Sequence, residues 1–371
     1  MKLKQLKLKN PEIKLKRPDT SLVGLEIEAG SIAAAEIDGG GTAVDKVAVQ
    51  PLAPEAFDDG EVVDAEAVTE ALRSLFEDNK LSKRVRLGIA NQRVVVRTVR
   101  LPAIEDPKEL GAAVRFSAQE QIAMPLDQAV IDHRVVGGVA ASEGAPPQID
   151  VMVVAARSDM IAASLKPLRD AGLEPVGVDL SAFGMIRALG EASLPEMSTE
   201  PDAVERPASA VLYCNIGDVT NLAVAKGRSC LFTRVSPTGF DDMAASLAAT
   251  TGLAREHARM WLEYTGLTRP LAEIEGDPGL LQQARQALER GVDSLLDELR
   301  LSLDFYGGQE AAIPVERVVL CGPGSAVPGF AERLEPGLNL PISIGRPEAL
   351  GGLDSASAAR LTLPYGLGLE H

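Results

Sequence analysis

Apolar residues recur with two different periods along this chain, and the change from one to the other predicts a mixed α/β protein. Residues 21–49 and 85–101 are strand-like, and the turn residues Gly39 to Gly41 interrupt the first stretch. Between the two stretches, the apolar residues after Asp64 recur at helical spacing. Strands and a helix in this order are typical of an α/β lobe.

A second unit begins at the boundary marked by Pro102 and Pro107. It predicts a compact inserted subdomain with helices at 107–121 and 159–171 and strands at 130–136, 149–156 and 176–180. The next segment, 191–207, is rich in Glu, Pro and Ser and has little periodicity. We interpret it as a flexible linker.

The second half of the chain repeats the pattern of the first. Strands are predicted at 210–214, 222–225, 230–235 and 318–320, and helices at 240–249, 255–264 and 280–306. Each half opens with a strand, a glycine turn and another strand. The chain therefore looks like two duplicated lobes.

Composition and charge narrow the classes of function. At 371 residues and 46% hydrophobic content the chain can fill several cores. The net charge of −16 and the single Trp261 disfavour nucleic-acid binding. No run of 18 apolar residues is present, which predicts a soluble, cytoplasmic protein. Three cysteines without metal-ligand spacing are expected to be buried reduced thiols, and the histidines have no nucleophile at a recognisable spacing.

The first 17 residues depart from this acidic average, with seven basic residues against one acid and interleaved Leu and Ile. Such a segment can lie on an anionic membrane, because its leucines enter the interface while its lysines meet lipid phosphates. A solvated tail explains it equally well. Contact of Lys2 to Arg17 with the inner face of the cytoplasmic membrane stays an open alternative.

Three glycine-rich segments carry the candidate chemistry, at 24–31, 215–221 and 318–325. A phosphate can be held between two hairpin turns when backbone N–H groups point inward and small residues leave room. An ordinary hairpin turn explains each segment taken alone, and none is a Walker A loop or a dinucleotide fingerprint. Their recurrence favours a nucleotide site with the candidate residues Gly30, Ser31, Asn215, Gly217, Asp218, Thr220, Asn221, Gly239, Gly322, Gly324 and Ser325.

These segments, together with the runs at 116–127 (Phe-Ser-Ala-Gln-Glu-Gln-Ile-Ala-Met-Pro-Leu-Asp) and 319–329, resemble the PilM proteins of type IV pilus and related machines. PilM proteins are actin-like and related to the division protein FtsA. The resemblance covers residues 22–367 and implies an actin-like ATPase (ribonuclease H-like) fold. It divides the chain into a basic tail (1–18), a first core lobe (19–104, with 346–368 returning to it), an inserted FtsA-like subdomain (105–190), a linker (191–207), a second core lobe (208–240 and 316–345) and its helical subdomain (241–315).

The resemblance also implies a partner. A PilM-like protein is a scaffold at the inner membrane that binds the N-terminal cytoplasmic tail of a PilN-like membrane protein and joins the PilN/PilO platform. The peptide groove is implied between the first lobe and the inserted subdomain. Candidate contacts are Phe116, Gln119, Glu120, Ile122, Met124 and Pro125. Core packing is the alternative role for Phe116, Ile122 and Met124.

The chain departs from the family at the phosphate segments. Glu26 replaces the usual aspartate, Glu28 a glycine and Ala33 a lysine, and Asn215 stands where an aspartate is usual. A glutamate at a phosphate-facing position crowds and repels the anion. Asn215 cannot hold Mg²⁺ by charge. We expect weakened ATP affinity, Mg²⁺ only together with nucleotide, no metal ligands or catalytic residues of the chain's own, and negligible hydrolysis.

Two other functions remain open from the sequence. An active actin-fold ATPase or kinase would need a base and a Mg²⁺-anchoring carboxylate, which Glu28 and Asn215 argue against. An FtsA-like filament-forming membrane anchor would carry its amphipathic helix at the C-terminus. Here the only basic amphipathic stretch is at the N-terminus.

Overall fold

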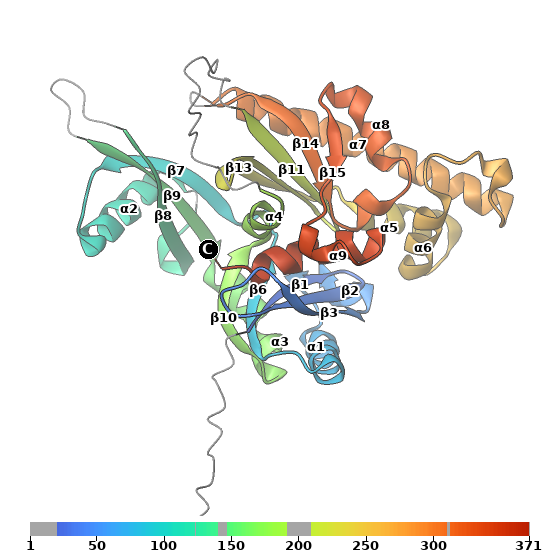
Figure 1. Ribbon diagram of the computed structural model, residues 1–371, viewed down its shortest axis with the longest axis horizontal. Coiled ribbons are helices and arrows are strands. Elements are labelled where there is room, and N and C mark those ends of the chain that lie inside the picture. Colours follow the sequence, from blue (N-terminus) through green and yellow to red (C-terminus); the bar gives the residue numbers. More distant parts are fainter. Residues whose placement is uncertain (1–20, 123, 140–146, 191–208, 310–311, 371) are drawn as a thin grey trace, which may run out of the picture.

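The computed structural model describes residues 21–122, 124–139, 147–190, 209–309 and 312–370 (Figure 1). The predicted tail at 1–18 and the whole of the predicted linker at 191–207 lie outside these residues. None of the described helices is long and apolar enough to span a membrane.

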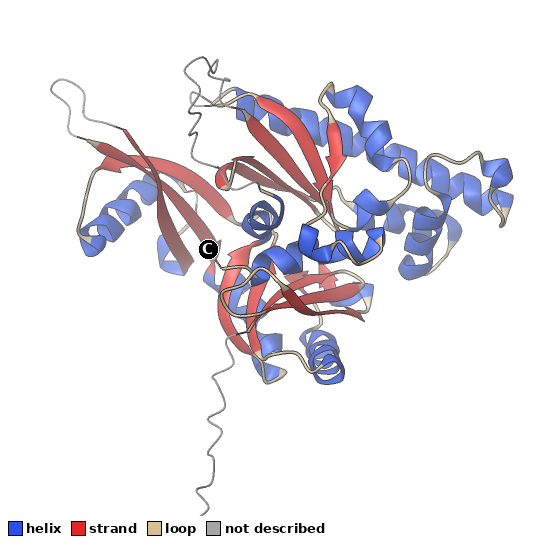
Figure 2. Ribbon diagram, in the orientation of Figure 1, coloured by secondary structure: helices blue, strands red, loops and turns tan. Residues whose placement is uncertain are grey.

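Two five-stranded sheets with the same topology form the framework (Figure 2). In each, three antiparallel strands are followed by two that run parallel to the first of them. The repetition matches the predicted duplication of lobes. The first sheet contains β10 (Glu174–Leu180), β6 (Arg84–Ile89), β1 (Leu22–Glu28), β2 (Ser31–Ile37) and β3 (Val44–Pro51), and the second contains β13 (Ser229–Ser236), β12 (Thr220–Lys226), β11 (Ala210–Ile216), β14 (Val315–Cys321) and β15 (Ile342–Ile344), each in spatial order.

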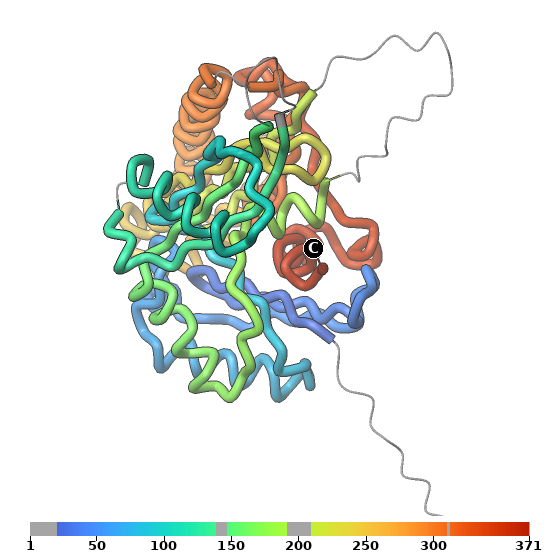
Figure 3. Tube along the Cα trace, turned by 90° about the vertical axis from the view of Figure 1, so that its left-hand side faces the viewer, coloured from blue at the N-terminus to red at the C-terminus, as the bar shows by residue number. Residues whose placement is uncertain are grey.

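Helices cover the outer faces of both sheets and fill the space between them. In the first lobe, α1 (Ala65–Asn79) and α3 (Ser158–Asp170) lie outside, next to the short hairpin of β4 (Phe57–Asp58) and β5 (Glu61–Val62). In the second lobe the outer helices are α5 (Phe240–Thr251), α6 (Arg255–Thr265), α7 (Pro278–Gly307) and α8 (Phe330–Leu338). Between the sheets lie α4 (Ser181–Leu189) and α9 (Ser355–Gly368) (Figure 1), and Figure 3 shows the C-terminal helix above the blue strands of the first lobe.

The inserted subdomain is a three-stranded antiparallel sheet covered on one face by a helix. Its spatial order is β7 (Val95–Pro102), β9 (Gln148–Arg157) and β8 (Ala129–Val139), and the helix is α2 (Pro107–Gln121). The sheet therefore spans 95–157, a different division from the predicted 105–190. Two elements of that range, α3 and β10, belong to the first lobe instead, because β10 pairs with β6 and α3 packs on α1.

The local signals explain why the predicted helices form. Asp64 caps α1 by accepting hydrogen bonds from the backbone N–H groups of Glu66 and Ala67, and Asp106 caps α2 in the same way. The helix predicted at 107–121 has those bounds in the structure, and those predicted at 240–249, 255–264 and 280–306 correspond to α5, α6 and α7. The sequence prediction of these helices is confirmed.

The three cysteines are free thiols in strands; Cys214 and Cys321 are buried, as predicted, whereas Cys230 is only partly buried. Even so, burial raises the pKa of the Cys230 thiol to about 12. Because the thiolate is the reactive form, we expect all three to react with a disulfide reagent at pH 8 at least tenfold more slowly in the native chain than in urea. Stopped-flow detection of the released thiolate measures this, and one rapidly reacting equivalent before unfolding would contradict it.

Candidate functional site

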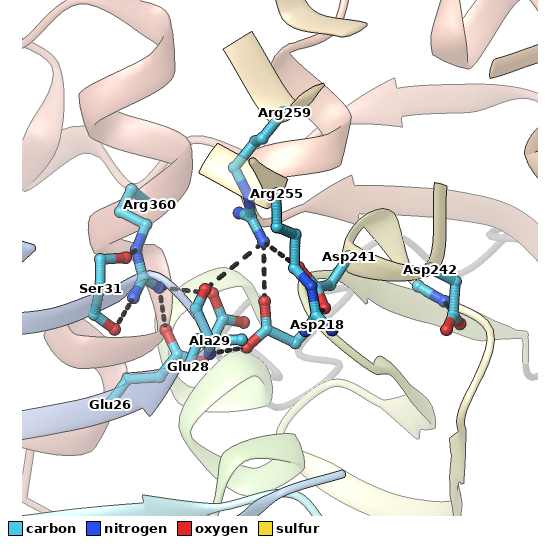
Figure 4. A network of polar contacts seen from close by, with 11 residues as sticks. Glu26, Glu28, Ala29, Ser31, Asp218, Asp241, Asp242, Arg255, Arg259 and Arg360 are labelled. Atoms are coloured by element: carbon cyan, nitrogen blue, oxygen red, sulfur yellow. Dashed lines mark hydrogen bonds and ion pairs between the residues drawn. The ribbon is translucent and has the colours of Figure 1, made fainter. Parts of the chain in front are cut away.

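The three glycine segments meet between the two sheets, at the ends of β1, β11 and β14. The β1–β2 turn of the first lobe faces the β11–β12 turn of the second (Figure 4). Gly30 has a φ of 91°, which a residue with a side chain rarely adopts, so it suits this two-residue turn. Gly239 lies directly behind the second turn, where an added Cβ would be 1.9 Å from the carbonyl oxygen of Asp218.

The predicted nucleotide residues are gathered here, but many of their polar groups bond to the protein itself. The Thr220 hydroxyl donates to the Thr238 carbonyl (2.6 Å), and the Ser325 hydroxyl donates to the Gly322 carbonyl (2.7 Å). The Cys321 thiol donates to Asn215 Oδ1 at 3.7 Å. Gly324 packs on Ile216, Gly322 lies against Asn215, and the buried Asn221 carries its Oδ1 without a hydrogen-bond donor among the described residues.

Arg360 of α9 forms ion pairs with both glutamates of the first segment. Its Nη1 lies 2.9 Å from Glu26 Oε2 and 2.9 Å from Glu28 Oε2. Its Nε and Nη2 donate to the hydroxyl and the carbonyl oxygen of Ser31, at 3.0 and 3.1 Å. All these contacts lie within the first lobe. The arginine fork thus fixes the first hairpin turn against α9 (Figure 4).

A second group of charges connects the lobes. Asp218 Oδ2 accepts a hydrogen bond from the backbone N–H of Ala29, and Asp218 Oδ1 lies 2.9 Å from Arg259 Nη2. The same Nη2 is 3.4 Å from Asp241 Oδ1 and 3.5 Å from the Ala29 carbonyl oxygen. Asp241 also pairs with Arg255 at 3.0 Å. Arg259 therefore connects the β11–β12 turn and α5 of the second lobe with the β1–β2 turn of the first lobe.

The charges of the two groups do not cancel. Four carboxylates (Glu26, Glu28, Asp218 and Asp241) face three guanidinium groups (Arg255, Arg259 and Arg360). Burial, and then the neighbouring Glu28, raise the pKa of Glu26 well above its usual range. The same two causes raise the pKa of Asp218. An excess carboxylate in a buried cluster favours retention of a proton.

Little space is left between the turns. The cavity there, lined by Glu26, Glu28, Asn215 and Asp218 among others, has a volume of about 30 Å³. The Glu28 carboxylate touches Gly217, where an added Cβ would be 1.9 Å from Glu28 Oε1. In the described parts of the chain, no group of three or more His, Cys, Asp or Glu residues is arranged to hold a metal ion.

Sequence reasoning did not identify Arg259, Arg360 or Asp241. Glu26 and Arg360 are separated by 334 positions, so no local pattern links them. The only available signal was indirect, since two glutamates at buried strand positions require a nearby cation.

A groove separates the inserted subdomain from the first lobe. It has a volume of about 500 Å³, and its apolar lining includes Val130, Val154, Ile161, Val176 and Phe183. Val130 and Val176 are half exposed, at 50% and 42%. Both walls include an edge strand, β8 on one side and β10 on the other.

The predicted partner contacts lie on the other face of the small sheet. Ile122 is buried against Val151 and Val153, whereas Met152 and Val154 line the groove, and alternate residues of a strand point to opposite faces. Phe116 is 70% exposed. Gln119, Glu120 and Pro125 are also exposed, and Met124 packs at the edge of the core beneath α2.

Comparison with known proteins gives the family. A family model described as type IV pilus assembly protein PilM matches residues 24–357. A solved "PilM-PilN type IV pilus biogenesis complex" is 25% identical, with a TM-score of 0.75 over 95% of this chain and 100% of that one. Ethanolamine utilization protein EutJ from Carboxydothermus hydrogenoformans, 14% identical with a TM-score of 0.53 over 95% and 90% of the two chains, shares the fold. The chain has an actin-like ATPase fold and belongs to the family of the type IV pilus assembly protein PilM.

Proposed function

We propose that this protein is a non-hydrolysing scaffold of a type IV pilus or related secretion machine, which binds the N-terminal cytoplasmic tail of a PilN-like membrane protein. The observation that carries the proposal is the groove between the inserted subdomain and the first lobe. Its volume of about 500 Å³ and its lining, in which Arg86, Asp132, Arg134 and Asp179 accompany the apolar residues, suit an extended peptide with both apolar and charged side chains. One of the similar solved structures is a PilM–PilN complex.

The charges between the hairpin turns support the absence of ATP hydrolysis. The guanidinium groups that would attract phosphates, those of Arg259 and Arg360, are paired with Asp218, Glu26 and Glu28. A cavity of about 30 Å³ accommodates little more than water, whereas small-molecule sites usually need ~300 Å³ or more. Phosphates with Mg²⁺ do not fit this arrangement, so we infer weakened or absent nucleotide binding.

Calorimetric titration with a synthetic peptide of the PilN-like tail tests the scaffold function, with and without Mg²⁺ and ATP. We expect the same Kd in both conditions and no phosphate release. The variant Val176→Asp should lower the affinity by about tenfold or more, because it places a charge among the apolar residues of the groove. A failure of the peptide to bind, or ATP turnover, would contradict the proposal.

Phe116→Asp is the matched control for the position of the site. Phe116 is an exposed apolar residue of the same subdomain, on the face opposite the groove. We expect its substitution to leave the affinity unchanged. If Phe116→Asp rather than Val176→Asp abolished binding, the predicted contact surface at Phe116, Gln119, Glu120, Ile122, Met124 and Pro125 would replace the groove as the binding site.

Peripheral membrane contact through Lys2 to Arg17 is a separate part of the proposal, supported by the seven basic residues of that segment. Co-sedimentation with anionic vesicles compares the full chain with one that starts at Asp19. We expect only the full chain to sediment, and less of it as salt concentration rises. Equal sedimentation of the two chains would remove the membrane contact.

A further inference from the structure

The Asp218 side chain occupies a position that a ligand phosphate would be expected to take. The N–H group of Ala29, in the first hairpin turn, is the kind of inward-pointing donor that phosphate sites use. Here it donates to Asp218 Oδ2 from the opposite lobe. On its other oxygen, Asp218 meets the Arg259 guanidinium at 2.9 Å.

The remaining contacts show that this arrangement is built into the fold. The Asp218 side chain is only 9% exposed and the Arg259 side chain 18%. Arg259 also forms an ion pair with Asp241, and its guanidinium lies 5.4 Å from the centroid of the Phe240 ring. The Glu28 carboxylate fills the space next to Gly217 from the other lobe. Both sides of the cleft thus supply charge to it.

We propose that Asp218 and Arg259 of the second lobe form an intramolecular latch, which holds the backbone of Ala29 in the first lobe and so keeps the two lobes together in place of a bound nucleotide. The proposal rests on the inference above that the cleft does not use ATP. In it, Asp218 supplies the negative charge and acceptor oxygens of a phosphate, and Arg259 supplies the cation. Closure of the lobes is therefore a constant property of the chain, independent of nucleotide concentration.

Distance measurement between the lobes tests the latch. Asp78 on α1 and Glu289 on α7 are exposed residues on opposite sides of the cleft, and cysteines at both positions of the full chain accept spin labels. We expect Asp218→Ala and Arg259→Gln each to broaden the distance distribution toward longer values. We also expect amide exchange at Ala29 to accelerate by about tenfold or more, because its charged acceptor is lost or loosened.

Arg234→Gln is the matched control. Like Asp218 and Arg259, Arg234 and Glu298 form an ion pair within the second lobe, at 3.0 Å, but among the described residues this pair makes no hydrogen bond to the Ala29 turn. This variant should leave the distance distribution unchanged. Asp218→Asn keeps an acceptor for the Ala29 N–H but removes the charge, so it should give an intermediate distance distribution. If Asp218→Ala does not fold, Asp218→Asn and Arg259→Gln together test the latch.

Two results would overturn the latch. The first is an unchanged distance distribution in folded Asp218 and Arg259 variants. The second is a shift of the unsubstituted chain on addition of Mg²⁺ and ATP, because the nucleotide would then enter where Asp218 lies. Peptide binding is not used as a readout, so failure of the partner peptide to bind would leave the latch intact.

Discussion

Replacement of Arg360 by Met should lower the free energy of unfolding by about 3–5 kcal/mol, the usual cost of removing one partner from a buried ion pair. The Arg360 side chain is 10% exposed and is 2.9 Å from each of Glu26 and Glu28. Methionine has similar length but no charge, so both carboxylates remain buried side by side without a cation. Urea unfolding at pH 7.5, followed by circular dichroism, measures the loss.

Removing the two unpaired carboxylates as well should restore much of the lost stability. In the triple variant Arg360→Met, Glu26→Gln and Glu28→Gln the site is neutral, so we expect recovery of at least half of the difference. A triple variant as unstable as Arg360→Met would mean that packing, and not charge, is what Arg360 contributes. A loss below about 1 kcal/mol in the single variant would place Arg360 among weak surface pairs.

The pH dependence gives an independent check. Burial raises the pKa of Glu26 in the folded chain, so its contribution to stability is complete below the unfolded pKa and is lost as pH rises through the folded pKa. Glu26→Gln has no group that ionises at this position, so its stability does not decrease in this way as pH rises. Relative to the unsubstituted chain, that variant should therefore become more stable between pH 5 and pH 8, and a constant difference over this range would contradict a raised pKa.

The sequence was sufficient for most of the elements, which depend on local patterns, and the recurrence of the glycine segments in the two halves predicted that they meet. Helical periodicity and an Asp cap define α2, and small residues at strand ends mark the two hairpin turns. It was insufficient for the chemistry of the cleft. Glu28 was interpreted as repelling a phosphate, but whether Arg259 or Arg360 would neutralise the acids depends on how α6 and α9 pack, which no periodicity records.

The inserted subdomain illustrates the same limit. Strand β7 follows β6 closely in the chain, and nothing in its alternation says that it pairs with β9 instead. The predicted boundary at 105 was therefore placed between Pro102 and Pro107, whereas the small sheet begins at Val95. Strand partners are decided by tertiary contacts that lie far apart in sequence.

Gly24 opens the first glycine segment, yet the structure gives it a packing role at the other end of β1 from the cleft. A Cβ at this position would lie 1.9 Å from the Pro364 carbonyl oxygen and 2.4 Å from the Gly368 nitrogen, both backbone atoms of α9. Because neither atom can move without displacing the helix, Gly24→Ala should cost about 3 kcal/mol or more. Urea unfolding followed by circular dichroism measures the change.

The control is another Gly→Ala substitution in a place with room. Gly111 lies within α2, and the nearest atom to its added Cβ is His133 Cε1 at 3.9 Å. Alanine there should stabilise the chain by about 0.5–1 kcal/mol through helix propensity. Equal stability of the two variants would show that α9 can shift away from β1. In that case the helix that carries Arg360 would not be fixed by the strand, and the close approach at Gly24 could not explain how Arg360 reaches Glu26 and Glu28.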